Sequence, residues 1–146
     1  MNPYDKEKTR EIWKRVLGEP EPPKPTAWLE RQLAETETAV CLYRRLAHRH
    51  TALWKMACAV CEERRRLETL WFLETGERMK RCAEPPRECT IPEALRWLHR
   101  REVGAAEEYR RAAQQFPAHR SMLCALANAA VCRAEVLFRM LQARLC

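Results

Sequence analysis

The sequence contains eight cysteines, and their thiols could carry chemistry. Cys58 and Cys61 have the spacing of half a zinc site, but no second pair follows them at ligand spacing. We expect both residues one turn apart in a helix, as small buried or half-buried hydrophobes. Cys82 and Cys89 fall in a central loop and form the pair that we expect to be most reactive. Thiol redox chemistry therefore stays open as an alternative function.

Other catalytic motifs are missing from the sequence. With three isolated glycines the chain has no Gly-rich phosphate loop, and neither a nucleophile elbow nor a Ser/His/Asp order stands out. His99 precedes Glu102 by one turn, but it stands beside Arg100 and Arg101 and is expected at the surface. Three further histidines fall in predicted turns without obvious partners: His48, His50 and His119. This pattern favours a protein without a conventional catalytic centre.

Helices are the elements that must position any site. Prolines gather before residue 26 and between residues 85 and 92, and long segments between them have none. We predict a short helix over 5–17 and four long helices over 27–47, 52–74, 91–115 and 121–145. In each long helix the expected inward residues recur in alternating steps of three and four, which is typical of a helix bundle. The four stripes are Leu29, Leu33, Thr36, Val40, Tyr43, Ala47; Leu53, Met56, Val60, Glu63, Leu67, Leu70; Leu95, Leu98, Glu102, Ala105, Tyr109, Ala112, Phe116; and Leu123, Leu126, Ala130, Arg133, Leu137, Met140.

The links between the helices predict the topology. Short links join the first long helix to the second and the third to the fourth, so each pair forms an antiparallel hairpin. The middle link, from Gly76 to Thr90, has 15 residues. Extended, it spans about 50 Å, whereas a helix of about 25 residues is about 37 Å long. We therefore predict an all-α antiparallel four-helix bundle over residues 26–146, in which a long crossover joins two hairpins, preceded by a helix and a Pro-rich linker over 1–25.

Two caps support these helix boundaries. Thr26 is expected to cap the helix over 27–47 through its hydroxyl. Thr90 and Glu93 have the spacing of a capping box at the start of the helix over 91–115.

A longer motif connects the sequence to a family. Glu102, Ala105, Tyr109 and Ala113 have the spacing Glu-x-x-Ala-x-x-x-Tyr-x-x-x-Ala, and Tyr43 repeats the tyrosine 66 residues earlier. Residues 62–77 look like the second helix of bacterial ferritin-like proteins of unassigned function. Over residues 27–145 the chain resembles the ferritin-like and rubrerythrin-like four-helix bundle superfamily. In that family, carboxylate and imidazole side chains from the four helices hold two iron or manganese ions.

The resemblance implies that the di-metal site is degenerate in this chain. The family's ligand positions fall on Thr36, Val60, Glu63, Glu102, Ala130 and Arg133. Only Glu102 keeps the family residue, while Glu63 keeps a possible oxygen ligand. Valine and alanine cannot bind a metal, and the fixed cation of Arg133 would repel one. We therefore expect neither a metal nor another cofactor, and instead a buried or half-buried Glu102–Arg133 ion pair with Glu63 across the core.

Two alternatives stay open. In one, the last helix rotates and Arg133 points to solvent. In the other, a slide of the helix over 52–74 puts Glu62 and Arg65 at the ligand positions, and a slide of the helix over 27–47 puts Glu35 or Glu37 there. A carboxylate-rich site that could bind one metal would then draw on Glu35 or Glu37 with Glu62, Glu63 and Glu102.

Charge and composition narrow the function further. The net charge of +7 invites a nucleic-acid interpretation, but the arginines, among them the pair Arg100 and Arg101, are interleaved with glutamates and are expected on solvated helix faces. No recognition motif accompanies them. The sequence contains no apolar run of about 18 residues, so we expect no membrane span. The polar N-terminus lacks the apolar region of a signal peptide. We therefore expect a cytoplasmic protein.

The function that we expect is a non-catalytic binding or assembly module, with a homodimer or an unknown protein as partner. A rubrerythrin-like iron or manganese oxidoreductase is the first alternative. A basic nucleic-acid-binding or thiol-redox regulator is the second.

Overall fold

The structure is a computed structural model that describes residues 3–18, 25–79 and 89–145 of the chain. The described residues form helices and no strand, which confirms the all-α prediction. The helices are α1 (Pro3–Leu17), α2 (Ala27–Ala47), α3 (Leu53–Thr75), α4 (Ile91–Gln115), the short 3₁₀ helix η1 (Pro117–His119) and α5 (Arg120–Leu145). Each predicted boundary lies within two residues of the observed one.

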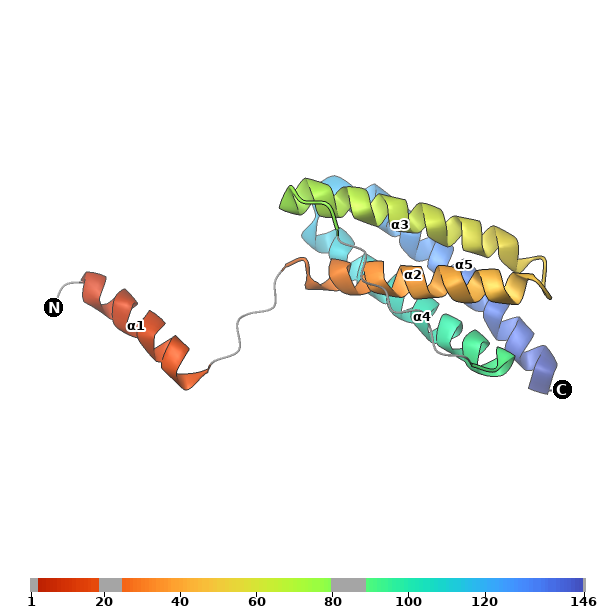
Figure 1. The fold of residues 1–146 in the computed structure, drawn as a ribbon. Coiled ribbons are helices and arrows are strands. Elements are labelled where there is room, and N and C mark those ends of the chain that lie inside the picture. Colours follow the sequence, from red (N-terminus) through yellow and green to blue (C-terminus); the bar gives the residue numbers. More distant parts are fainter. Residues whose placement is uncertain (1–2, 19–24, 80–88, 146) are drawn as a thin grey trace.

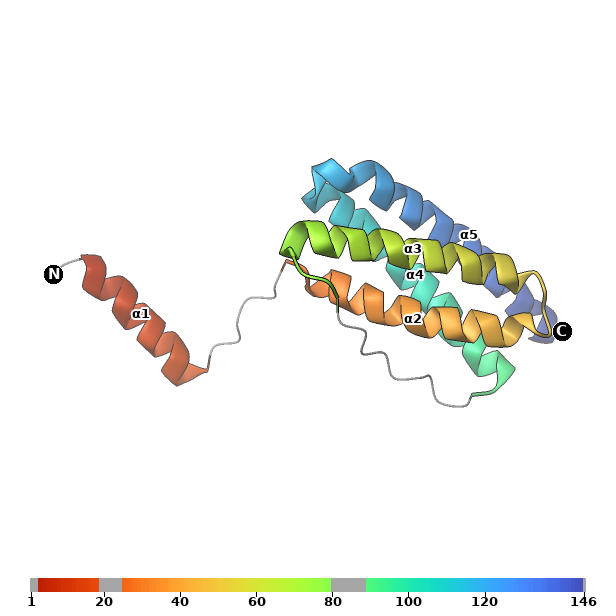
Figure 2. The same cartoon turned by 45° about the horizontal axis from the view of Figure 1, so that its top comes forward.

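The four long helices pack side by side (Figures 1 and 2). Helix α2 packs along α3, α4 packs along α5, and α2 also contacts α4. Each of the two pairs forms an antiparallel hairpin. Helix α4 begins at the end of the bundle opposite to the end where α3 stops (Figure 1). The end of α3 and the start of α4 therefore lie at opposite ends of the bundle, and most of the link between them lies outside the described residues.

The hydrophobic core consists of two clusters separated by polar side chains. One cluster gathers around Leu46, Leu53 and Leu95. The other gathers around Leu33, Leu70 and Leu123, near the opposite ends of the same helices. The stripes predicted from the sequence are buried along α2, α3, α4 and α5, except that Phe116 and Met140 at two stripe ends are half-buried. Between the clusters lies a layer of buried carboxylates and guanidinium groups.

The helix ends confirm one predicted cap and correct the other. Thr90 accepts a hydrogen bond from the Glu93 N–H, and the Glu93 carboxylate accepts one from the Thr90 N–H, so the capping box is present. The cap predicted at Thr26 is wrong, because its hydroxyl makes no cap hydrogen bond. Its ψ of 2° departs from the extended conformation that a capping hydroxyl needs. The Thr26 carbonyl instead accepts from Leu29 N–H at 3.0 Å and Glu30 N–H at 3.1 Å.

Helix α1 stands apart from the bundle (Figure 1). Its end is marked by Gly18, whose φ of +60° is a conformation that favours glycine. The apolar side chains Ile12, Trp13 and Val16 share one face and are 57%, 56% and 70% exposed. No other helix therefore covers the apolar face of α1 in the described part of the chain.

One helical stretch of the bundle is long and apolar. Pro117–Arg144 is long and apolar enough to cross a membrane by length and composition, within the residues described. The core helix of a soluble protein passes the same test, and here the inward side chains Leu123, Leu126 and Leu137 are buried in the bundle. The expectation that the chain has no membrane span stays a prediction.

Candidate functional site

The six positions expected in the central layer all face the interior. They are at most 6% exposed: Thr36, Val60, Glu63, Glu102, Ala130 and Arg133. The register that the stripes predicted is therefore confirmed. The alternative slide of α3 is wrong, because Glu62 and Arg65 are exposed. In α2 the buried residue is Thr36, and its neighbours Glu35 and Glu37 are only half-buried.

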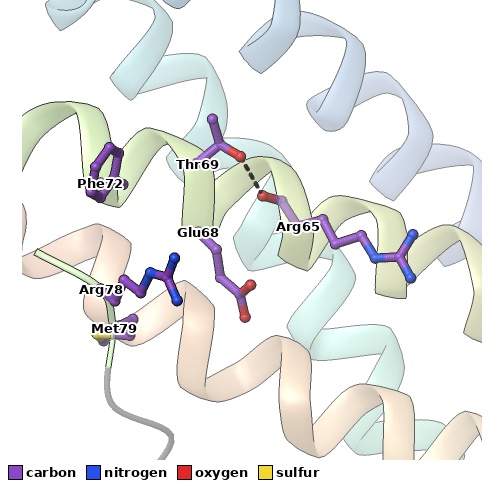
Figure 3. Close-up of a pocket in the computed structure, with 6 residues that line it drawn as sticks. All are labelled: Arg65, Glu68, Thr69, Phe72, Arg78 and Met79. Atoms are coloured by element: carbon purple, nitrogen blue, oxygen red, sulfur yellow. Dashed lines mark hydrogen bonds between the residues drawn. The ribbon is translucent and has the colours of Figure 1, made fainter.

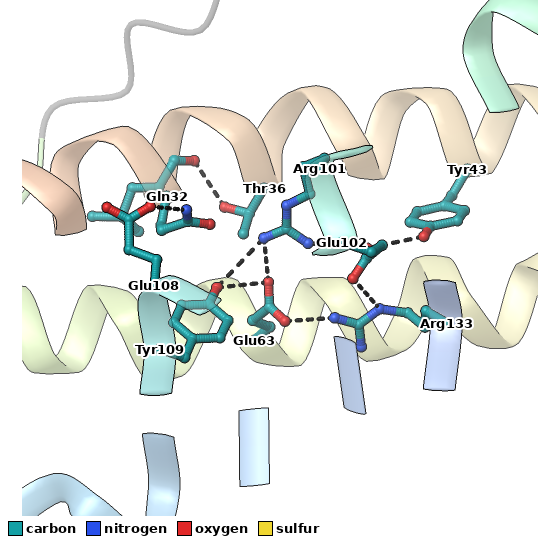
Figure 4. A network of polar contacts seen from close by, with 10 residues as sticks. Gln32, Thr36, Tyr43, Glu63, Arg101, Glu102, Glu108, Tyr109 and Arg133 are labelled. Atoms are coloured by element: carbon teal, nitrogen blue, oxygen red, sulfur yellow. Dashed lines mark hydrogen bonds and ion pairs between the residues drawn. The ribbon is translucent and has the colours of Figure 1, made fainter. Parts of the chain in front are cut away.

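The predicted ion pair between Glu102 and Arg133 is present (Figure 4). Arg133 Nε donates to Glu102 Oε2 at 3.0 Å, and Arg133 Nη2 donates to Glu63 Oε1 at 2.6 Å. One guanidinium group thus joins a carboxylate of α4 to a carboxylate of α3. The alternative in which Arg133 points to solvent is wrong, because Arg133 is 6% exposed.

A second arginine, Arg101, completes the layer, and the sequence analysis missed it. Arg101 was assigned with Arg100 to a solvated face, yet it is 4% exposed while Arg100 is exposed. Arg101 Nη1 donates to Glu102 Oε1 at 3.0 Å, and Arg101 Nη2 donates to Glu63 Oε2. The signal that could have found it is helical spacing, because residue 101 lies one turn from both Leu98 and Ala105 on the inward face of α4.

Two tyrosines donate the remaining hydrogen bonds to the carboxylates. The Tyr43 hydroxyl donates to Glu102 Oε1 at 2.9 Å, and the Tyr109 hydroxyl donates to Glu63 Oε2 at 2.9 Å. Each tyrosine therefore binds a carboxylate of the other hairpin (Figure 4). All four carboxylate oxygens accept at least one hydrogen bond, and the two negative charges are balanced by two guanidinium groups.

The surroundings of Glu63, Tyr43 and Tyr109 keep these three groups in the protonation states that their contacts require. Burial alone would raise the pKa of Glu63, but Arg101 and Arg133 together lower it below its ordinary value. Burial raises the pKa of Tyr43, and Glu102 raises it further. Burial and then Glu63 raise the pKa of Tyr109. Both tyrosines consequently stay protonated and act as hydrogen-bond donors.

The residues of the layer do not fit a di-metal site. Among the described residues, no group of three or more histidine, cysteine, aspartate or glutamate side chains is arranged to hold a metal ion. The two carboxylates that a metal would use already accept from Arg101, Arg133 and two tyrosine hydroxyls. A metal dication would have to displace both guanidinium groups, which also repel it.

Most of the cysteines that the structure describes are exposed. Cys61 is half-buried as expected, but Cys58 is exposed, because it lies two residues before Val60 and so on the opposite side of α3. Cys89 is half-buried, and its expected redox partner Cys82 lies outside the described residues. The reactivity of that pair stays a prediction.

The histidines have partners that the sequence did not indicate. His99 is half-buried rather than at the surface, and its ring lies 5.9 Å from the ring of Phe138. The turn histidines contact Trp54, Arg144 and Glu74: His48 packs edge-on against the tryptophan ring, His50 approaches the arginine, and His119 lies 3.9 Å from the glutamate.

A surface hollow of about 620 Å³ lies beside the last turns of α3 (Figure 3). Phe72 and Met79 form apolar parts of its wall, and Arg65, Glu68 and Arg78 bring charges to it. The Thr69 hydroxyl donates to the Arg65 carbonyl at 3.0 Å, so this hydroxyl is satisfied by its own helix. The hollow lies outside the central layer and contains none of the six predicted positions.

Comparison with known proteins identifies no relative. No family model, no curated protein and no solved structure matches this chain.

Proposed function

We propose that this protein is a ferritin-like four-helix bundle that has lost its di-metal site and acts as a non-catalytic binding or assembly module. The observation that carries the proposal is the central layer, where Arg101 and Arg133 occupy the centre and each binds both Glu63 and Glu102. In such a layer the buried charges balance one another, and the hydrogen bonds hold the side chains in fixed positions. It leaves no open coordination position for oxygen or peroxide chemistry.

The arrangement of the helices supports the ferritin-like part of the proposal. Two hairpins are joined across the length of the bundle, which is the connection of ferritin-like bundles. The layer is also built the same way from both halves, since Tyr43 of α2 binds Glu102 and Tyr109 of α4 binds Glu63. This exchange between halves is the pattern expected when each hairpin once supplied equivalent ligands to a shared centre.

Helix α1 supports the binding or assembly part. A helix of 15 residues is marginally stable in water when nothing packs against it. The exposed face formed by Ile12, Trp13 and Val16 would gain stability from contact with a second surface. A second copy of the chain is the partner that we test first.

Metal analysis tests the loss of the di-metal site. The full-length protein is purified from cells supplied with iron and manganese, and both metals are measured per chain. We expect far less than one metal ion per chain and no iron-dependent oxidation of substrate or consumption of peroxide. A Glu102→Gln variant serves as the control, because metal adsorbed elsewhere on the protein is unaffected by that change. Near-stoichiometric metal that disappears in Glu102→Gln would overturn the proposal in favour of the rubrerythrin-like alternative.

A further inference from the structure

An open groove of about 270 Å³ runs along the seam between α4 and α5. Its lining comes from one stripe of α4 and one of α5 at helical spacing, and the apolar part of it is Val103, Ala106, Val131, Ala134 and Phe138. Val103 and Phe138 are exposed, whereas both alanines are buried, so two large side chains flank a floor of small ones. The volume is below the range of small-molecule pockets, which begins at about 300 Å³. The groove is therefore better suited to the side chains of a docked protein segment.

Charged side chains border this groove. Glu107 of α4 and Glu135 of α5 line opposite walls and are exposed, and Arg110 lies toward one end. His99 lies toward the other end. The contact of Glu107 with Arg111 at 3.7 Å joins two exposed side chains, so solvent screens it and Glu107 can turn to a closer cation. The border of the groove therefore favours a partner that is apolar with cationic flanks.

Helix α1 has the complementary surface. Its apolar face, formed by Ile12, Trp13 and Val16, is exposed. With about 3.6 residues per turn, Arg10 and Arg15 fall on the two borders of that face. Both arginines are exposed, and the glutamates of α1 lie on the opposite side of the helix. The helix therefore offers an apolar stripe between two cations.

We propose that α1 of one copy lies in the groove between α4 and α5 of a second copy, with Trp13 over the alanine floor. The two arginines that border the apolar face of α1 then lie against the two glutamates of the groove. An apolar helix face laid in an apolar groove is a recurring mode of recognition, in which residues one turn apart act as anchors. The inference rests on the assembly role proposed for α1 and adds the surface that receives it.

A second copy fits better than the groove of the same chain. Helix α1 stands apart from its own bundle (Figure 1). Four of the seven residues 19–25 are prolines, a composition typical of semi-rigid spacers. A single helix in a single groove is also a small interface, whereas reciprocal exchange between two copies makes two such contacts and closes the assembly with two-fold symmetry.

The hollow beside α3 is less suitable for α1. Arg65 and Arg78 line it together with one carboxylate, that of Glu68. The arginines of α1 would there face other arginines, so the charges favour the groove between α4 and α5.

Substitution in the groove tests the receiving surface. Sedimentation equilibrium of the full-length protein is expected to show dimers, and Phe138→Ser is expected to weaken association at least tenfold, because it removes the largest apolar side chain of the groove. Val136→Ser, at an exposed residue of the same helix outside the lining, should leave association unchanged. Circular dichroism checks that each variant is folded. Association that survives in folded Phe138→Ser would overturn the groove but not the assembly role of α1, whereas a monomeric wild type would overturn both.

A reversal of charge tests the same surface with less risk to the fold. Glu135→Arg is expected to weaken association several-fold, because it turns a cation toward the arginines of α1. Glu62→Arg, at an exposed residue of α3 outside the groove, should not. Equal association of the two variants would refute the placement of α1 in this groove.

Mixing of variants tests the exchange between copies. Trp13→Ser retains an intact groove and Phe138→Ser retains an intact α1, so a mixed pair has one complete contact. We expect the equimolar mixture to associate more tightly than either variant alone, measured by sedimentation. A mixture of Trp13→Ser with the double variant has no intact α1 and is the control. No gain on mixing would refute the exchange, and a monomeric wild type that sediments with phosphatidylserine vesicles would assign the apolar face of α1 to an anionic membrane instead.

Discussion

Each carboxylate of the central layer is held by both guanidinium groups, so the four charges balance only as a set. In a low-dielectric interior this has two consequences. An intact network contributes little net stability, because desolvation of the charges offsets much of their attraction. Removal of one arginine is strongly destabilising, because a buried carboxylate then lacks its counter-charge.

The adjacent arginines of α4 provide a matched test of this asymmetry. Arg101→Leu is expected to lower the free energy of unfolding by about 3–5 kcal/mol, because it strands charge on Glu63 and Glu102. Arg100→Leu, at the exposed neighbour, is expected to change it by no more than about 0.5 kcal/mol. Urea unfolding followed by circular dichroism measures both values. Similar losses for the two variants would contradict the buried network.

The stability of the layer should also depend on pH. The pKa of Glu63 is lowered in the folded protein, so its contribution to stability is complete above the pKa of an unfolded glutamate, about 4.3, and is lost as the pH falls through the folded value. The free energy of unfolding of the wild type should therefore fall as the solution is acidified from about pH 5 to about pH 3. Glu63→Gln should flatten that dependence, measured by urea unfolding at each pH. Glu62→Gln, at the exposed neighbour, should keep the wild-type slope, and a Glu63→Gln slope equal to wild type would argue against the shift.

The same residues show how far the sequence predicts the site. Glu63, Glu102 and Arg133 were placed together because apolar residues on both sides of each fix its helix face. Arg101 was missed because the adjacent residues Arg100 and Arg101 resemble a solvated face, although helical spacing from Leu98 puts Arg101 on the inward face. Charge composition describes a segment, whereas burial is decided residue by residue around a helix.

At the scale of the elements, alternating steps of three and four predicted which face of each helix is buried, because a bundle imposes that period on every helix. Link lengths predicted the pairing of the helices. Cap geometry was less predictable, because a cap depends on backbone angles that one residue type does not fix. Thr90 adopts the extended conformation with ψ of 161°, whereas Thr26 has ψ of 2°.

The two threonines give a matched prediction. Thr90→Ala is expected to lower the free energy of unfolding by about 1 kcal/mol, because it removes the hydroxyl that accepts from Glu93 N–H. Thr26→Ala is expected to have almost no effect, because its hydroxyl makes no cap hydrogen bond. Urea unfolding measures both variants. An equal loss at Thr26 would mean that its hydroxyl caps α2 after all.

At the scale of the whole molecule, the exposed apolar side chains are distributed unevenly. The bundle buries its stripes, whereas α1 leaves Ile12, Trp13 and Val16 exposed on a short helix that packs on nothing in the described chain. A free helix of this length gains most of its stability from tertiary contact. The apolar face of α1 is therefore the part of the molecule that we expect to bind a partner.

If that partner is a second copy, association should depend on the apolar face of α1. We expect sedimentation equilibrium to show a mass above the 17.3 kDa of one chain at high protein concentration, because two exposed apolar faces are then buried together. Trp13→Ser should weaken association at least tenfold, since a tryptophan contributes a large apolar surface. Trp54→Ser, at an exposed tryptophan of the bundle, is the control and should leave the mass unchanged. A monomer at every concentration, or association that survives Trp13→Ser, would show that α1 does not join copies of this chain.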